Sequence, residues 1–311
     1  MSVSKPTAID LVEVAPRDGF QSISEPLPTA DKIRAIQALL DAGLRRIEIG
    51  SFVSPKAVPQ MADMADIVAE FIGREGVRLS ALVPNLKGAE LALAKGVREL
   101  VYVVSVSETH NQKNVRQSVS QSLDGLRAIA DKVREVDPAG FLRLDLGTSF
   151  DCPYEGRIAG DQVARVLEQA LTITDGLTLE VALCDTTGRA NPYQIQETLQ
   201  QVRQSVGPEA CTWAFHGHNT FGMGVANALF ALQHGVTVLD ASCAGLGGCP
   251  FAPGATGNTA TEDLLFALAE GGIDTGVDMA GLLAAADLIA ALPGGQTASS
   301  LRQVPRTRAV A

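Results

Sequence analysis

Two histidines one residue apart end an apolar run in the stretch AFHGHNTFG, residues 214–222. If the run beginning at Thr212 is a β-strand, side chains two positions apart point to the same face. His216 and His218 would then present both imidazoles to one face, which is how a strand offers two ligands to one metal ion. The same spacing also occurs in histidines that are merely solvated or hydrogen-bonded, so the spacing alone leaves both alternatives open.

The histidine run is one of eight short apolar runs that alternate with helical patterns. The expected strands are residues 11–16, 46–52, 78–84, 99–106, 141–148, 179–186, 212–218 and 237–245. Alternation of strands and helices indicates parallel strands with right-handed crossovers. Eight such units predict the α/β class and a closed (β/α)8 TIM barrel over residues 1–272. Residues 273–311 are expected to add a C-terminal helix, roughly 278–292, and a loosely held polar tail from Gly294.

Residues able to do chemistry recur at the carboxyl ends of these strands, where such barrels carry their sites. They are Arg17 and Asp18 after the first strand, Glu48 near the end of the second, His110 and Asn111 after the fourth, Asp185 at the end of the sixth, the two histidines of the seventh, and Cys249 after the eighth. Mixed nitrogen and carboxylate ligands suit an octahedral Mg²⁺ or Mn²⁺ ion better than a closed zinc cage. The leading ligands are Asp18, His216 and His218.

A glycine-rich segment, AGLGGCPFAPGATGNTATEDLL, follows the last strand at residues 244–265. It is either a mobile lid that carries the Cys249 thiol, or a long turn in which Asn258 caps the helix expected over residues 259–269. Glu262 and Asp263 are better explained as favourable first-turn acids of that helix than as metal ligands.

The composition limits the partners. The 311 residues carry a formal net charge of −10 and contain no run of lysines or arginines, which argues against nucleic acid or an anionic membrane as a partner. Neither a leader-like N-terminus nor a membrane-length apolar span is evident, so a soluble cytoplasmic protein is expected. The five cysteines include no C-x-x-C pair and are expected to be free thiols.

Six stretches together resemble the 3-hydroxy-3-methylglutaryl-CoA lyase family of metal-dependent (β/α)8 lyases. They are VAPRDGFQ, IEIGSFVSPKAVPQMAD, CPYEG, DTTGRANP, HGHNTFGMGVANALFAL and AGLGGCPFAPGATGNTATEDL. The similarity runs from about Leu11 to Ala269, and GLGGCPFAPGATGN is its most specific part. The family cleaves a 3-hydroxy-3-methylglutaryl thioester to acetoacetate and acetyl-CoA. The resemblance implies that Asp18, His216, His218 and Asn258 bind Mg²⁺ or Mn²⁺, that Arg17 and Glu48 lie in the catalytic centre, and that Cys249 acts in proton transfer.

The chemistry of that cleavage explains why such residues are needed. A bound ion lowers the pKa of the third-carbon hydroxyl and fixes the geometry. The permanently charged Arg17 suits the oxygen of the developing enolate, with Glu48 orienting it, and the Cys249 thiol suits the final proton donation. Asp185 either assists the base, supports the site from behind, or caps the helix after the sixth strand. Which group first takes the hydroxyl proton stays open.

Coenzyme A is expected as part of an acyl-CoA substrate. Arg17, Gln21, Lys56, His110 and Asn111 are predicted to contact that substrate. Lys56, Lys113, Arg116, Arg157 and Arg189 are either contacts for its phosphates or ordinary solvated charges. A homo-oligomer, specifically a dimer, is expected.

One departure from the family pattern concerns the segment after Arg17-Asp18-Gly19. Ser22, Ile23 and Ser24 stand where the family usually has Asn, Glu and Lys, which predicts a less polar rim beside the substrate. A lyase for a related 3-hydroxyacyl-CoA therefore stays an alternative. Condensing enzymes of the same superfamily, such as isopropylmalate or homocitrate synthases, share R-D-G-x-Q and H-x-H. The GLGGCP loop and the short extension favour a lyase over a synthase, and the filled reactive positions disfavour a non-catalytic binding protein.

Overall fold

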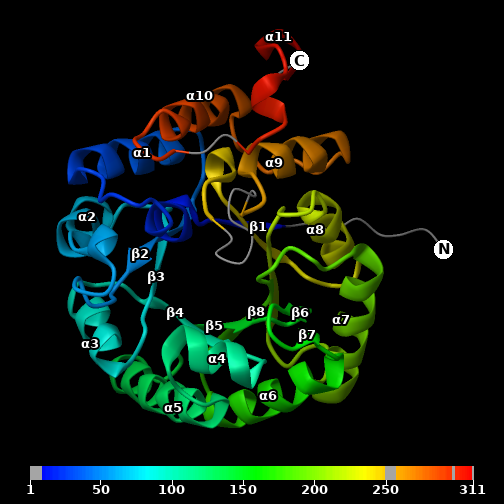
Figure 1. Cartoon of the computed structure of the whole chain (residues 1–311). Helices are drawn as coiled ribbons and strands as arrows, with labels where there is room; N and C mark the ends of the chain where they lie inside the picture. Colours follow the sequence, from blue (N-terminus) through cyan, green and yellow to red (C-terminus); the bar gives the residue numbers. More distant parts are fainter. Residues whose placement is uncertain (1–8, 249–256, 296–297, 310–311) are drawn as a thin grey trace.

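The computed structural model describes residues 9–248, 257–295 and 298–309, and Figure 1 draws the remaining residues as a thin grey trace. Eight parallel strands surround one axis, and helices form a ring outside them (Figure 1). Cys249 and residues 250–256 of the glycine-rich segment lie outside the described residues.

The closed barrel confirms the predicted (β/α)8 fold. Its strands are β1 (Asp10–Glu13), β2 (Arg46–Ser51), β3 (Arg78–Leu82), β4 (Glu99–Ser105), β5 (Phe141–Gly147), β8 (Thr178–Asp185), β9 (Thr212–Gly217) and β10 (Val238–Ala241). They close in the order β1-β10-β9-β8-β5-β4-β3-β2. β1 and β10 end earlier than the sequence predicts, because the chain turns there into the short helices η1 (Ala15–Gly19) and η3 (Cys243–Gly245).

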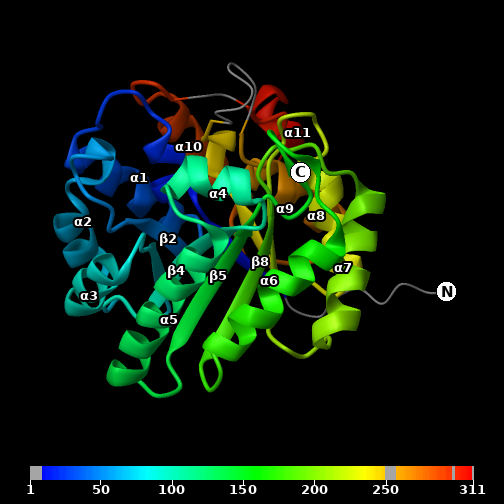
Figure 2. The same cartoon turned by 60° about the horizontal axis from the view of Figure 1, so that its bottom comes forward.

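The outer ring follows from the helical patterns between the strands. It comprises α1 (Thr29–Asp41), α2 (Met64–Phe71), α3 (Leu86–Ala94), α5 (Val119–Val136), α6 (Gly160–Ile173), α7 (Pro192–Val206), α8 (Gly224–Gln233) and α9 (Thr261–Glu270). A 3-10 turn, η2 (Pro59–Met61), precedes α2, and the short helix α4 (Glu108–Val115) follows β4. A small antiparallel hairpin, β6 (Asp151–Cys152) with β7 (Gly156–Arg157), follows β5 outside the barrel. Figure 2 shows α4 above the ends of β4 and β5.

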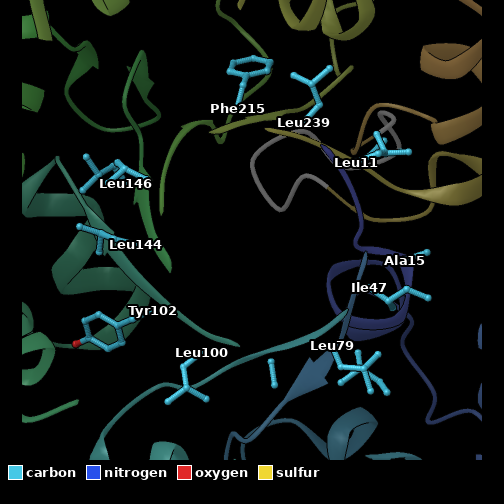
Figure 3. Close-up of a cluster of buried hydrophobic side chains, with 14 of the residues drawn as sticks. Leu11, Ala15, Ile47, Leu79, Leu100, Tyr102, Leu144, Leu146, Phe215 and Leu239 are labelled. Carbon is cyan, nitrogen blue, oxygen red and sulfur yellow. The ribbon is translucent and has the colours of Figure 1, made fainter. Parts of the chain in front are cut away.

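The strands alternate between two kinds of side chain because successive residues face opposite sides. One set is apolar and packs between barrel and helices; it includes Ile47, Leu100, Leu144 and Phe215, which Figure 3 shows around the barrel wall. This set belongs to the main hydrophobic core.

The other set combines a second, small apolar cluster, which includes Val12, Ala182 and Ala214, with buried charges. Arg46 of β2 pairs through two hydrogen bonds, of 2.9 and 2.8 Å, with Glu180 of β8. These two strands occupy opposite positions in the ring, so the ion pair crosses the interior. Arg143 of β5 contacts Asp145 at 2.7 Å, Glu180 at 3.1 Å and Asp240 at 2.6 Å. These four buried charges are therefore paired with one another, together with Asp240, which offsets the cost of removing them from water.

The extension packs against the barrel's outer ring. Its helix α10 (Met279–Ala290) lies along α1, and the Asp278 amide donates to the Ala42 carbonyl oxygen at 2.8 Å. The Asp263 carboxylate accepts hydrogen bonds from Ser299 Oγ and from the Ser300 and Leu301 amides. The expectation of a loosely held tail is therefore wrong for residues 298–309, which end in η4 (Leu301–Gln303) and α11 (Arg306–Ala309). The domain boundary at residue 272 stays a prediction.

Among the described residues, no helix has both the length and the apolar character needed to cross a membrane.

Candidate metal centre and active site

Three predicted ligands meet at one end of the barrel. Asp18 lies in η1 directly after β1, His216 lies at the end of β9, and His218 follows that strand. One ligand atom from each residue lies within 4.8 Å of the others, and the described residues contain no second cluster of this kind. Both histidines are buried. A carboxylate and two imidazoles at this separation fit one divalent ion.

The turn that carries Asp18 is tightly built. The Arg17, Asp18 and Gly19 amides all donate to the Val14 carbonyl oxygen, at 3.1, 2.8 and 3.3 Å. A Cβ atom on Gly19 would lie 3.0 Å from the Leu246 side chain, so this position favours glycine. The Arg-Asp-Gly sequence thus places two charged side chains at the strand end and leaves room for the η3 segment.

Asn258 joins this cluster rather than capping a helix. Its side-chain nitrogen donates to Asp18 Oδ2 at 2.7 Å and to the Leu246 carbonyl oxygen at 3.1 Å. Helix α9 begins at Thr261 with Ala260 as its N-cap and no side-chain cap, so the alternative in which Asn258 caps it is wrong. Because the amide nitrogen faces Asp18, the amide oxygen is the atom that can bind a cation.

Arg17 is held between two carboxylates. Its Nε lies 2.7 Å from Glu48 Oε1, and its Nη1 lies 2.6 Å from Asp18 Oδ1. Burial raises the pKa of Glu48, and the Arg17 charge opposes that rise. The hydrogen bond to Glu48 thus holds the Arg17 guanidinium in place, and the catalytic roles of both residues stay predictions.

Electrostatics favour a cation between the three ligands. Burial raises the pKa of Asp18, but Arg17 and the two histidines outweigh it and bring that pKa down to about 2. Burial and the neighbouring His216 lower the pKa of His218 to about 4. The buried Nδ1 of His218 has no hydrogen-bond partner within the described ranges. An ionised carboxylate beside a neutral imidazole with an unpartnered nitrogen is a fitting environment for a metal ion.

Asp185 ends β8 and pairs in register with Gly217, between the two histidines. Both carboxylate oxygens lie 3.2 Å from the Ala190 amide nitrogen, and burial raises the pKa of Asp185 to about 7. The cap of α7 is Asn191, so the alternative in which Asp185 caps that helix is wrong.

The predicted substrate contacts differ in their surroundings. His110 is buried with its Nδ1 2.7 Å from Ser105 Oγ. The Asn111 side-chain nitrogen donates to Gln117 O and Ser122 Oγ, and its oxygen accepts from the Ser105 amide, so this residue ties α4 to β4 and α5. Gln21 and Lys56 are exposed.

Of the basic residues proposed as phosphate contacts, two stack on aromatic rings. Lys113 Nζ lies 5.0 Å from the centre of the Tyr154 ring, and the Arg189 guanidinium lies 5.3 Å from that of Phe221. Arg116 ends α4 with a φ of 59°, and Arg157 lies exposed in β7. These contacts are compatible with either alternative.

The prediction that Ile23 makes the rim less polar is wrong. Ile23 is only 3% exposed and belongs to the hydrophobic core, close to Gly294. Ser22 is exposed, and its Cβ lies 3.7 Å from the position that a Cβ on Gly248 would take. Among the three residues that differ from the family pattern, Ser22 is therefore the one that lies beside the segment leading to Cys249.

Two supporting residues were not identified from the sequence. Asp240 of β10 lies 3.0 Å from His216 Nδ1 through its Oδ2, and Glu13 of β1 accepts hydrogen bonds from the Ala15 and Cys243 amides. The available signal was an acidic residue in a buried strand: Asp240 within the otherwise apolar VLDA of β10, and Glu13 at the end of DLVE in β1.

The fold and the site together define a (β/α)8 barrel with a carboxylate–dihistidine centre at the carboxyl ends of its strands. Comparison with known proteins is in accord. The HMGL-like family model matches residues 8–289. The mitochondrial hydroxymethylglutaryl-CoA lyase of Homo sapiens is 40% identical over 96% of this chain and 90% of its own length. The 3-hydroxy-3-isohexenylglutaryl-CoA/hydroxy-methylglutaryl-CoA lyase of Pseudomonas aeruginosa is 42% identical over 94% of this chain and 96% of its own.

Solved structures of hydroxymethylglutaryl-CoA lyases are also similar to this chain. The crystal structure of hydroxymethylglutaryl-CoA lyase from Pseudomonas aeruginosa has a TM-score of 0.88 and 41% identity, and the match covers 95% of this chain and 96% of that one. An HMG-CoA lyase from Acinetobacter baumannii in complex with coenzyme A and 3-methylmalate has a TM-score of 0.86 and 38% identity, with 96% of both chains covered. The chain belongs to the HMGL-like family and is a carbon–carbon lyase.

Proposed function

We propose that this chain is a divalent-metal-dependent lyase that cleaves 3-hydroxy-3-methylglutaryl-CoA to acetyl-CoA and acetoacetate. The observation that carries the proposal is the convergence of Asp18, His216 and His218, with Arg17 bonded directly to Asp18. The names of the relatives support the same substrate class.

Asp18, His216, His218 and the Asn258 amide oxygen would hold Mg²⁺ or Mn²⁺. An ion bound there supplies a Lewis acid that makes the third-carbon hydroxyl of the substrate acidic. The unpartnered Nδ1 of His218 and the low pKa of Asp18 support this ligand set.

Arg17 is assigned to the thioester oxygen. When the bond between the second and third carbons breaks, the electron pair moves toward the thioester and its oxygen becomes enolate-like. A guanidinium already fixed by Glu48 and Asp18 can donate to that oxygen without reorganising. Its remaining N–H groups are the donors assigned to this role.

Two proton transfers complete the reaction. The hydroxyl proton leaves as the ketone of acetoacetate forms, and Asp185 is assigned to assist this step because its pKa of about 7 allows exchange near neutral pH. The enolate carbon then takes one proton to give the methyl group of acetyl-CoA, and the Cys249 thiol is assigned as the donor.

The acyl group allows a second candidate function. The Pseudomonas aeruginosa relative is named for a 3-hydroxy-3-isohexenylglutaryl thioester as well as for the hydroxymethylglutaryl one. Substrates extended at the third carbon are therefore included in the test, with kcat/KM compared across the series. A homodimer and a cytoplasmic location stay predictions.

The test is thioester consumption by the metal-stripped full-length chain after Mg²⁺ or Mn²⁺ is restored, without any keto-acid acceptor. A lyase cleaves under these conditions, whereas a condensing enzyme needs the acceptor. His216→Ala and His218→Ala should lose metal affinity and nearly all turnover. His234→Ala is the matched control, because this histidine ends α8 and bonds to the Phe230 carbonyl oxygen. Normal turnover of both His216→Ala and His218→Ala at limiting metal would contradict the proposal.

A further inference from the structure

Asp240 supports one of the two histidines from inside the barrel. It lies on β10 and is the register partner of His216 on β9. Its Oδ2 atom is 3.0 Å from His216 Nδ1 and 2.6 Å from the Arg143 guanidinium. Asp240 and Arg143 are both buried, so these contacts are shielded from water.

This contact determines which nitrogen of His216 carries the proton. A neutral imidazole has one N–H and one lone pair, and an ionised carboxylate can only accept a hydrogen bond. A carboxylate facing Nδ1 therefore places the proton on Nδ1 and leaves the lone pair on Nε2.

We propose that Asp240 is a positioning residue for the metal centre: it fixes His216 as the Nδ1–H tautomer and so presents Nε2 to the ion. The proposal rests on the metal site proposed above. In this role Asp240 would act through His216 rather than as a ligand of its own.

Arg143 keeps Asp240 suited to this role. Its guanidinium also contacts Asp145 and Glu180, and Glu180 in turn pairs with Arg46 across the barrel. The positive charge beside Asp240 favours the ionised, acceptor-only carboxylate. His218 provides the contrast, because its Nδ1 has no hydrogen-bond partner in the part of the chain that the structure describes. His216 is thus the ligand whose orientation the barrel sets in advance.

A simpler explanation is that Asp240 only neutralises Arg143. A variant of Glu180 distinguishes the two explanations. Like Asp240, Glu180 contacts the Arg143 guanidinium, at 3.1 Å, but it also pairs with Arg46. If neutralisation were the whole role, Glu180→Gln would disturb the metal centre as Asp240 variants do.

The first test reads the tautomer without any metal. The chain has four histidines, so ¹⁵N-histidine labelling gives four ring systems, and His216→Ala assigns the one of interest. At pH 8 we expect a proton on Nδ1 of His216 in the metal-free wild type and a shift to the Nε2–H form in Asp240→Ala. A bare Nδ1 in the wild type overturns the proposal, and this spectrum needs no variant of Asp240 to fold.

The second test measures free Mn²⁺ by electron paramagnetic resonance. Asp240→Ala should weaken Mn²⁺ binding by roughly 10- to 100-fold, the range typical of lost partners behind a metal ligand. Asp240→Asn should lose less because an amide oxygen can still accept from Nδ1, and Glu180→Gln should bind within about twofold of wild type. Circular dichroism and thermal unfolding check that each variant is folded.

The outcomes separate the two proposals. Wild-type Mn²⁺ affinity in a folded Asp240→Ala, with His216→Ala defective, overturns the positioning role and leaves the metal site standing. Equal weakening in Glu180→Gln also overturns it. A wild type that does not bind Mn²⁺ defeats the metal site instead, while the tautomer spectrum still decides the role of Asp240.

Discussion

Arg17 reaches two carboxylates at once, Glu48 through Nε and Asp18 through Nη1. A lysine has a single ammonium on a flexible stem and cannot reproduce this fork. We expect Arg17→Lys to lower kcat by about 10²- to 10³-fold, the usual cost of losing one oxyanion donor, while Mn²⁺ binding is largely kept. Steady-state kinetics and Mn²⁺ titration check both parts. Arg165→Lys, on the exposed face of α6, is the control, and a kcat within threefold of wild type in Arg17→Lys would refute the assignment.

The sequence identified the proposed metal ligands more completely than the residues that support them. Asp18, His216 and His218 could be predicted because strand ends converge in any (β/α)8 barrel, whatever the packing. Asp240 could not, because its role depends on the register of β9 against β10 and on an arginine from β5. Such pairings are long-range and are not encoded in local spacing.

At the scale of elements, a single carboxyl group joins three segments of the site. Glu13 Oε1 accepts from the Ala15 and Cys243 amides, each at 2.9 Å, and Oε2 accepts from Thr261 Oγ1 at 2.7 Å. Ala15 begins the turn that carries Arg17 and Asp18, Cys243 begins η3, and Thr261 begins α9. Glu13 thus ties the segments that carry the proposed ligands Asp18 and Asn258 to the end of β1.

The hydrogen bonds of Glu13 predict that the free energy of unfolding depends on pH. Burial raises the pKa of Glu13 to about 7 from its ordinary value near 4.5. The folded state therefore holds this proton more tightly than the unfolded state, so the stability from Glu13 is present below about pH 4.5 and falls as pH rises to about 7. Glu13→Gln keeps an acceptor oxygen and can donate to Thr261, but stays neutral. Its free energy of unfolding relative to wild type should rise by about 3 kcal/mol across that window.

Urea unfolding at pH 5 and pH 8 measures this difference. Glu262, whose pKa burial also raises, is present in both proteins and largely cancels. Parallel pH curves for the two proteins would show that Glu13 does not titrate as described.

The segment after η1 makes a different prediction. Because Ile23 is buried in the core, Ile23→Glu would place an unpaired charge there. We expect a loss of about 3 kcal/mol or more in the free energy of unfolding, whereas exposed Ser24→Lys should stay within about 0.5 kcal/mol of wild type. Thermal and urea unfolding of the two variants provide the comparison, and unchanged stability in Ile23→Glu would place its side chain at the surface.

At the scale of the whole molecule, the fold was predictable because one pattern repeats around the barrel. Strand runs such as RIEIGS and FLRLDLG gave both the barrel wall and, in their alternate residues, its charged interior. The interior pairing was not predictable, since Arg46 and Glu180 meet only when the ring closes. The anchored tail was also missed, because its contacts with Asp263 involve backbone amides that no side-chain pattern reveals.

The most direct test of the central claim follows the product of a single reaction in D₂O. Metal-restored wild type is mixed with 3-hydroxy-3-methylglutaryl-CoA, and the acyl-CoA product is analysed by mass spectrometry at short times. Cleavage through an enolate predicts acetyl-CoA with one deuteron in its methyl group, formed with equimolar acetoacetate, only when Mg²⁺ or Mn²⁺ is present, and not in His216→Ala. Free coenzyme A with uncleaved hydroxymethylglutarate, or metal-independent cleavage in His216→Ala, would contradict the account.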